Sequence, residues 1–275
     1  MPRFEEQAVP RGLAFSRDGH SQGCMGVAAG DFDVDGRLDL FVTNFYREPN
    51  ALYRQQEGGL FTDESATRGI ARSSRAMLGF GTQFLDAELD GLPGLVVTNG
   101  HIDDLSDQGV PYQMRPQYFR NLGGRFAEWP AGETGSYFER KWLGRGLARL
   151  DWNLDGRPEF VVSHIGAPAV LTENRTENAG HYVAVELVGR VSARDAIGAT
   201  VTVSWNGRRL VRQLTAGDGY MASNHRRLVF GLGNATRIDR LEVKWPSGQT
   251  QTLKDLAADQ TLRCVEGGKA FRLPR

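Results

Sequence analysis

The chain has 275 residues, with 33 lysines and arginines balanced by 33 aspartates and glutamates, so its formal net charge is zero. A neutral chain without a basic stripe lacks the electrostatic footprint of a nucleic-acid-binding protein, and no nucleic-acid partner is expected. No apolar run approaches the ~20 residues of a membrane helix, so no membrane insertion is expected. The two cysteines, Cys24 and Cys264, lie far apart in the sequence. Two separate thiols are favoured, and a disulfide between them stays open.

The first strongly informative segment is residues 31–39, which read Asp-Phe-Asp-Val-Asp-Gly-Arg-Leu-Asp. Oxygen-bearing side chains stand at positions 1, 3, 5 and 9, around a glycine at position 6. Ca²⁺ takes six to eight oxygen ligands, and glycine lets the chain turn sharply between them. The pattern returns in altered form at 86–94 and 151–159. We call these segments loops one, two and three, and the sequence predicts a calcium site in the first and third.

In loop one, the expected ligands are four carboxylates and one backbone carbonyl, from Asp31, Asp33, Asp35, Asp39 and Arg37 respectively. Four carboxylates this close would repel one another without a cation. The alternative is a solvated turn, since Asp and Gly both favour turns.

In loop three, the expected ligands are the side chains of Asp151, Asn153, Asp155 and Glu159 and the carbonyl of Arg157. This set carries one charge fewer than loop one, so weaker binding is expected, because ligand charge tunes calcium affinity.

Loop two offers Asp86, Glu88 and Asp90, but Gly94 occupies position 9. Losing that carboxylate removes the ligand that ties the turn to the next strand, so a relic turn without metal is favoured here.

A second motif runs in step with the loops. Phe4-Glu5-Glu6 begins a stretch, 4–13, that matches 61–70, and a weaker copy begins at Phe126. Each phenylalanine precedes the next acidic loop by a similar distance. Repeats at a fixed period indicate stacked or radial units. The segment 4–13 therefore corresponds to the end of a unit whose earlier strands are absent.

Inside each unit the pattern is that of β-structure. Short apolar stretches flank the loops at 25–29 and 38–43, 80–85 and 95–98, and 146–150 and 160–163. No segment has a sustained helical period. Four short strands per unit are typical of a propeller blade. An EF-hand is excluded, because it needs flanking helices and a glutamate at position 12, where loops one and three have Val42 and Val162.

The loop followed by the strand Leu38-Asp39-Leu40-Phe41-Val42-Thr43-Asn44 resembles the FG-GAP/VCBS calcium-loop propeller repeats, also found in integrin α-chains. The resemblance covers residues 1–175. It implies an all-β partial propeller of about three four-stranded blades, with Ca²⁺ as cofactor.

A second domain is expected at 180–266, followed by a C-terminal tail at 267–275. Strand candidates lie at 182–188, 199–205, 208–214, 227–231, 241–245 and 250–253, and Asn206-Gly207 is a hairpin signal. They predict a small antiparallel β-sandwich or barrel.

This domain looks like ASPIC/UnbV, through the motifs at 192–199, 217–224, 230–233 and 243–248. Propeller repeats followed by this domain resemble the cartilage acidic protein 1 family, whose members are typically secreted or periplasmic. An extracellular or periplasmic location is therefore implied, although no signal peptide is visible at Met1.

Three units are fewer than the 4–8 blades of closed propellers. The expected explanations are missing N-terminal blades or, less simply, self-association that completes a ring.

The resulting functional hypothesis is a non-enzymatic calcium-binding adhesion or interaction module, in which the propeller or the C-terminal domain binds a protein or glycan. The alternative is a carbohydrate-active enzyme, for which His101, Asp103 and Asp104 are the only nameable candidates. A solvated inter-strand loop is the favoured reading of those three residues.

Overall fold

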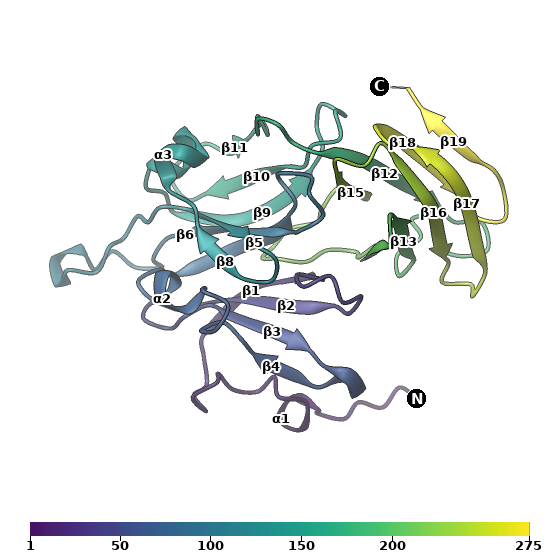
Figure 1. Cartoon of the computed structure of the whole chain (residues 1–275). Helices are drawn as coiled ribbons and strands as arrows, with labels where there is room; N and C mark the ends of the chain where they lie inside the picture. Colours follow the sequence, from purple (N-terminus) through teal and green to yellow (C-terminus); the bar gives the residue numbers. More distant parts are fainter. Residues whose placement is uncertain (275) are drawn as a thin grey trace.

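The computed structural model describes residues 1–274, and most of its regular secondary structure is β-strand (Figure 1). The first domain holds three antiparallel sheets, each a meander in chain order. The first sheet contains β1 (Cys24–Gly30), β2 (Asp39–Asn44), β3 (Ala51–Gln55) and β4 (Phe61–Asp63). The second sheet contains β5 (Gly79–Leu85), β6 (Gly94–Asn99), β7 (Gln117–Asn121) and β8 (Phe126–Glu128). The third sheet contains β9 (Gly144–Leu150), β10 (Glu159–His164) and β11 (Val170–Leu171).

Helices are short and lie between strands. The α-helices are α1 (Ala8–Arg11), α2 (Ala71–Ser74), α3 (Ala131–Thr134) and α4 (Ser136–Glu139), and single 3₁₀ turns cover Glu57–Gly59 and Ser106–Gln108. Within residues 1–274, none of the helices has the length and apolar character needed to cross a membrane.

The three acidic loops connect the first two strands of each sheet and share one backbone conformation. Position 4 has a positive φ in all three, at +62° in Val34, +55° in Leu89 and +63° in Leu154. The glycine at position 6 has φ between +87° and +88° in each loop. A side chain at that glycine would be strained, which explains why the residue recurs. The predicted strands on both sides of each loop are confirmed.

The sheets pack face to face through their alternating residues. Phe41 and Leu52 of the first sheet meet Leu95 and Phe119 of the second in one buried cluster. On the other face of the second sheet, Val96, Tyr118 and Leu85 meet Leu147, Phe160 and Val162 of the third. Because strand side chains alternate between faces, one strand serves both interfaces. Figure 1 shows the three sheets following one another from β4 to β10.

The third sheet has three strands where the other two have four. After β11 the chain passes into the second domain without a fourth strand equivalent to β4 or β8. The outer edge of β11 therefore pairs with no strand in the described chain, residues 1–274.

The second domain is a sandwich of two four-stranded sheets. One has the order β15-β12-β18-β19 and the other β14-β13-β16-β17. Valines of β12 and β13 and both Trp205 and Trp245 are buried between them in a single core. The strands are β12 (His181–Val188), β13 (Thr200–Trp205), β14 (Arg208–Gln213), β15 (Arg227–Gly233), β16 (Arg237–Lys244), β17 (Thr250–Ala257), β18 (Gln260–Val265) and β19 (Ala270–Leu273).

Two details of this domain differ from the sequence prediction. The strand β18 was not predicted, and it pairs with β12 in parallel, so the sandwich is not purely antiparallel. The segment predicted as a tail, 267–275, contains β19, which pairs with β18. Gly267, in the left-handed region, provides the turn between β18 and β19. The favoured prediction for the cysteines is confirmed: Cys24 is exposed and Cys264 buried, both as free thiols, so the disulfide left open is not formed.

A long connection of the second domain, residues 215–226, reaches across to the first domain. Gly219 forms a β-bridge with Val27 of β1. The side chain of Asn224 accepts a hydrogen bond from the Arg149 N–H of β9 at 2.7 Å and donates one to Gln83 of β5 at 2.9 Å. The connection thus touches the first strand of all three sheets.

Candidate metal centre

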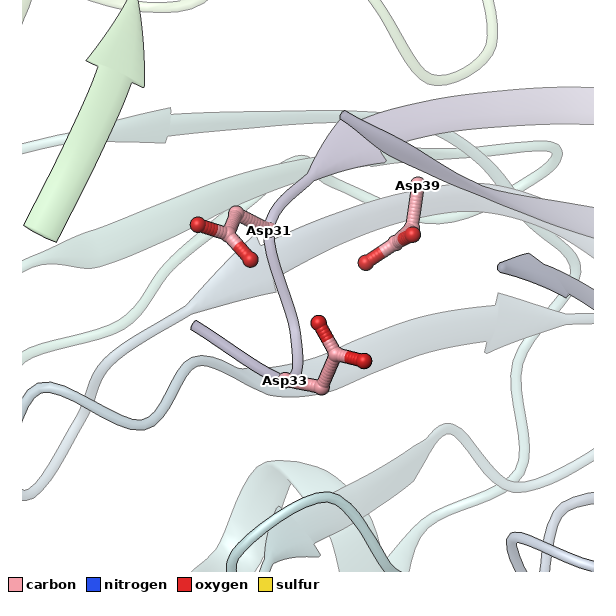
Figure 2. Close-up of side chains that lie close together, drawn as sticks. All are labelled: Asp31, Asp33 and Asp39. Atoms are coloured by element: carbon pink, nitrogen blue, oxygen red, sulfur yellow. The ribbon is translucent and has the colours of Figure 1, made fainter. Parts of the chain in front are cut away.

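Loop one brings three carboxylates together. Asp31 directly follows β1, Asp33 lies two residues further along the loop, and Asp39 is the first residue of β2. One carboxylate oxygen from each residue lies within 4.8 Å of the others. Figure 2 shows the three side chains around one space beside the loop. Calcium–oxygen distances of 2.3–2.6 Å place ligand oxygens on opposite sides of the ion about 5 Å apart, so this spacing suits the ion.

Hydrogen bonds from the backbone hold two of these carboxylates in place. Asp31 accepts from the N–H of Asp35 at 3.0 Å and from that of Gly36 at 2.9 Å. Asp39 accepts from the N–H of Phe32 at 3.1 Å and from that of Gln55 at 2.8 Å. The side chains are therefore set by the loop itself and by β3, before any ion binds.

The electrostatics of the cluster favour a cation. Burial, together with the nearby carboxylates, raises the pKa of Asp39 to about 7 and that of Asp31 to about 6, against backbone hydrogen bonds that lower both. Oδ1 of Asp33 is buried and has no hydrogen-bond partner among the described residues. A buried oxygen without a donor is costly unless something satisfies it. The residues present therefore fit a hard divalent cation with oxygen preference.

Two arginines partly neutralise this cluster. The guanidinium of Arg54 bonds to Asp33 and also lies 2.9 Å from Asp35, and Arg37 pairs with Asp35 as well. Asp35 was predicted as a ligand, but in this structure its carboxylate faces these arginines and lies outside the three-carboxylate cluster.

Loop three keeps the backbone of loop one but not its cluster. Oδ2 of Asp151 accepts from the Gly156 N–H, as in loop one, and its Oδ1 is buried without a partner among residues 1–274. Burial raises the pKa of Glu159 to about 7, with the charges of Asp155 and Asp151 adding to it. Asn153 donates to Asp155 at 3.0 Å.

The counter-charge of loop three comes from the second domain. Arg227 of β15 lies 3.0 Å from Asp151 and 2.6 Å from Glu186. Its side chain is buried, so the contact occurs in a low-dielectric site.

In loop two, the side chains of Glu88 and Asp86 have partners within the protein. Glu88, expected at position 3, instead accepts from the Tyr118 hydroxyl at 2.9 Å and pairs with Arg120 at 3.2 Å. Asp86 is buried, and the nearest cation is Arg212 of β14 at 3.8 Å. Burial raises the pKa of Asp86 to about 6, and Arg212 lowers it in part. The relic turn favoured for loop two stays a prediction.

Sequence reasoning missed the arginines that the second domain supplies, Arg212 and Arg227. It also missed Asn121 and Asn174, at one equivalent place after the third strand. Asn121 donates to the carbonyls of Phe32 and Pro93, and Asn174 donates to those of Ala87 and Pro158. Each amide thereby ties position 8 of its own loop to position 2 of the preceding loop. The sequence signal that could have found them is an asparagine at or just beyond the end of the third strand in the second and third units.

The loop tips also meet the second domain. Val34 of loop one packs against its sandwich core, and Leu89 of loop two is buried with Tyr182 and Ala184. The carbonyls of Glu88 and Leu89 accept from Gly180 and Gly233 at 2.9 and 2.8 Å. The acidic loops are thus part of the interface between the domains.

The second candidate site, His101 with Asp103 and Asp104, is not brought together. Nδ1 of His101 lies 2.8 Å from the carbonyl oxygen of Asp103, and the ring packs beside Phe45 and Tyr46. Asp104 accepts from Ser106 at 2.6 Å. His101 contacts the backbone of Asp103 and Asp104 contacts Ser106, so no contact joins the three side chains among the described residues.

Comparison with known protein families gives one match: residues 189–270 match the ASPIC and UnbV family. The second domain is therefore similar to ASPIC/UnbV, as the motifs predicted, and the match does not extend to the first domain. Among curated proteins, none matches this chain.

Two solved structures are similar to the chain at low identity. The exotype rhamnogalacturonan lyase YesX is 14% identical, with a TM-score of 0.29, over 87% of this chain and 49% of that chain. The rhamnogalacturonan lyase YesW is 13% identical, with a TM-score of 0.29, over 90% of this chain and 54% of that chain. The chain spans about half the length of these two lyases, and likeness at this level carries no argument about its activity.

Proposed function

We propose that the chain is a non-enzymatic calcium-binding interaction module that works outside the cytosol, in the extracellular or periplasmic space. The observation that carries the proposal is loop one, where Asp31, Asp33 and Asp39 surround one space and a buried oxygen of Asp33 has no hydrogen-bond partner among residues 1–274. Asp151 and Glu159 of loop three form the second, weaker candidate.

Bound Ca²⁺ would supply positive charge and fix the loop between β1 and β2. Backbone N–H groups orient the carboxylates of Asp31 and Asp39. Val34, at the tip of the loop, packs against the core of the second domain. A ligand that binds only the folded state stabilises it by mass action, about 2.7 kcal/mol at one hundred times Kd.

We further propose that the three sheets are blades of an FG-GAP-type propeller. The support is their equivalence: the same meander, the same loop with positive φ at positions 4 and 6, and face-to-face packing of each sheet on the next. Asn121 and Asn174 add support, because they tie each loop to the preceding loop through equivalent hydrogen bonds.

The partner, a protein or glycan, has a candidate place on the first domain. A groove of about 1080 Å³ lies between the second and third sheets, with Tyr118, Arg120 and Trp129 in its lining. The Arg120 guanidinium lies 5.0 Å from the centre of the Trp129 ring. An aromatic face beside hydrogen-bonding groups suits a polar ligand with apolar patches, such as a saccharide.

The direct test is a calorimetric calcium titration of the chelator-stripped chain, paired with thermal unfolding with and without calcium. We expect saturable binding and a raised Tm, with the stronger site lost in Asp39→Asn and both sites retained in Asp107→Asn, which changes an exposed carboxylate outside the acidic loops. A folded chain that takes up no calcium and shows no Tm shift would overturn the proposal.

A carbohydrate-active enzyme is the other hypothesis. It requires a convergent acid and base, whereas His101 contacts the backbone carbonyl of Asp103 and Asp104 contacts Ser106. Turnover on a glycan panel that is lost in His101→Ala, with calcium binding kept, would favour the enzyme.

A further inference from the structure

The N-terminal segment has the structure of a connection between two repeat units. Leu13 donates to Ala8 as Ile70 donates to Ser65, at 2.8 and 2.9 Å. Gly12 and Gly69 both have a positive φ, and a side chain on either would stand 2.3 Å from a strand carbonyl, that of Phe61 or that of Phe126. The sequence match between 4–13 and 61–70 is therefore a structural match as well.

This equivalence assigns a role to the residues just before the connection. Phe61-Thr62-Asp63 forms β4 and Phe126-Ala127-Glu128 forms β8, the fourth strands of their sheets. The corresponding residues, Phe4-Glu5-Glu6, have no strand partner among residues 1–274 and are exposed, with the Phe4 side chain fully in solvent. Among residues 1–274, the segment 4–6 therefore corresponds in sequence to a fourth strand but has no third strand beside it.

The third sheet lacks a fourth strand, the strand to which residues 4–6 correspond. Its strands β9, β10 and β11 occupy the places of the first three strands, and the outer edge of β11 is unpaired within the described chain. Val170, Leu171 and Thr172 line the large groove at this edge. An unpaired strand edge is a template for another strand.

The first and third sheets each have one face on which no neighbouring sheet packs within residues 1–274, and these two faces are the next feature that suits a second copy. On the face of the first sheet that points away from the second, where Leu40 is half-buried, Val42 and Tyr53 are buried in a cluster with Leu13 and Phe61. They occupy the register positions that Val97 and Phe119 occupy in the second sheet, where these residues pack on the first sheet. On the free face of the third sheet, Val161 pairs with Leu171, which is 50% exposed.

We propose that residues 4–6 of one chain pair with β11 of a second copy, completing its third sheet and bringing that sheet onto the first sheet of the donor. This is strand addition between identical chains, and it goes beyond the proposed function. Two chains joined in this way contribute six sheets, within the 4–8 blades of closed propellers.

The register follows from the existing sheets. Phe61 lies opposite Gln55, and Phe126 lies opposite Asn121, the residue equivalent to Asn174. Phe4 of one chain therefore lies opposite Asn174 of the other, and Glu5 lies opposite Glu173. Like charges directly opposite are unfavourable. Here Arg175 already pairs with Glu173 at 2.6 Å and offsets the repulsion.

The test is cross-linking between single-cysteine variants made in a Cys24→Ser background, which leaves only the buried Cys264. Directly opposite residues have Cα atoms about 4.5–5.5 Å apart, within the range that a disulfide spans. We expect Glu5→Cys mixed with Glu173→Cys to form a covalent dimer under mild oxidation. The control is Asp18→Cys mixed with Glu173→Cys, which places an exposed cysteine outside the matching segment and should give no dimer.

The second measurement is analytical ultracentrifugation of the unmodified chain over a range of concentrations. We expect concentration-dependent dimers, and Phe4→Asp should weaken association by about 10- to 100-fold, as expected for loss of one buried aromatic side chain. Val9→Asp, at another exposed position, should not weaken it. Because Phe4 is fully exposed, its replacement should leave the Tm of the monomer unchanged.

A chain that stays monomeric at every concentration would overturn the proposal. A disulfide that forms within one chain in the Glu5→Cys/Glu173→Cys double variant, but not between single variants, would also overturn it. Calcium titration of the same samples separates this inference from the proposed function, since loop one can bind calcium in a monomer.

Discussion

In loop one the counter-charge comes from Arg54 of the same sheet, whereas in loop three it comes from Arg227 of the other domain. The two loops have the same backbone, with matching φ values at positions 4 and 6. The D-x-D/N-x-D-G spacing therefore determines the turn, and the surroundings determine how its carboxylates are neutralised. In loop one, three carboxylates surround a space for an ion. In loop three, Asp151 instead pairs with the buried side chain of Arg227.

The largest expected effect comes from removing the buried arginine of loop three. Arg227→Met leaves Asp151 and Glu186 without their shared partner in a buried site. Breaking such a pair by removing one side costs about 3–5 kcal/mol in the free energy of unfolding, because an uncompensated charge stays buried. Urea unfolding with calcium absent measures this directly.

The matched control is the neighbouring residue. Arg226 pairs with Asp195 at the surface, so Arg226→Met should cost at most about 1 kcal/mol. Equal losses in the two variants would show that Arg227 does not neutralise loop three in the way we describe. Adding Asp151→Asn to Arg227→Met should recover part of the loss, since the orphaned charge is removed.

A smaller effect is expected from the competing arginine of loop one. Arg54→Met frees Asp33 and Asp35 for a cation, and we expect calcium to bind up to about tenfold more tightly, a gain of about 1.4 kcal/mol. Arg120 stands at the equivalent position in the second sheet and pairs with Glu88. Arg120→Met should therefore leave the calorimetric titration of loop one unchanged. Weaker binding in Arg54→Met would mean that the arginine supports the metal centre instead of competing with it.

The comparison also shows what the sequence can and cannot predict. The loops, their glycines and the strands beside them were predicted because these features are local: nine residues determine the turn. The partners of loops two and three were not, since Arg212 and Arg227 lie more than 70 residues away and look like ordinary polar positions of exposed strands. Glu88 fits the ligand spacing, yet its side chain reaches Tyr118 and Arg120.

Long-range pairing limited the fold prediction in the same way. The strand β18 has no hairpin partner before it in the sequence, because it pairs in parallel with β12 from the start of the domain. The residues of β18 can be recognised as a strand only once that partner is known. The strand β19 then follows by a local hairpin, in a segment that polar composition alone identifies as a tail.

The smallest effect is expected at Glu266, a carboxylate that contrasts with those of loop one. Burial acts to raise its pKa, but donors prevail and hold the pKa at about 2: the hydroxyls of Ser247 and Ser192 and the N–H groups of Arg190 and Ser192. In the unfolded chain a glutamate titrates near 4.3. A depressed native pKa means that the stabilisation is present above about pH 4.3 and is lost as the pH falls towards 2.

Glu266→Gln tests that sign. The variant should be less stable than the parent chain at pH 6, and the difference should shrink as the pH falls from 4.3 towards 2, because protonation removes the same charge from the parent. Thermal unfolding at pH 6, 4 and 3 measures the trend, with Glu177→Gln as a control at an exposed position. A difference that stays constant with pH would show that the glutamine disturbs packing and that the charge of Glu266 is not what holds the 190–192 turn. In loop one the carboxylates have too few donors and favour a cation, whereas at Glu266 the chain itself provides the donors.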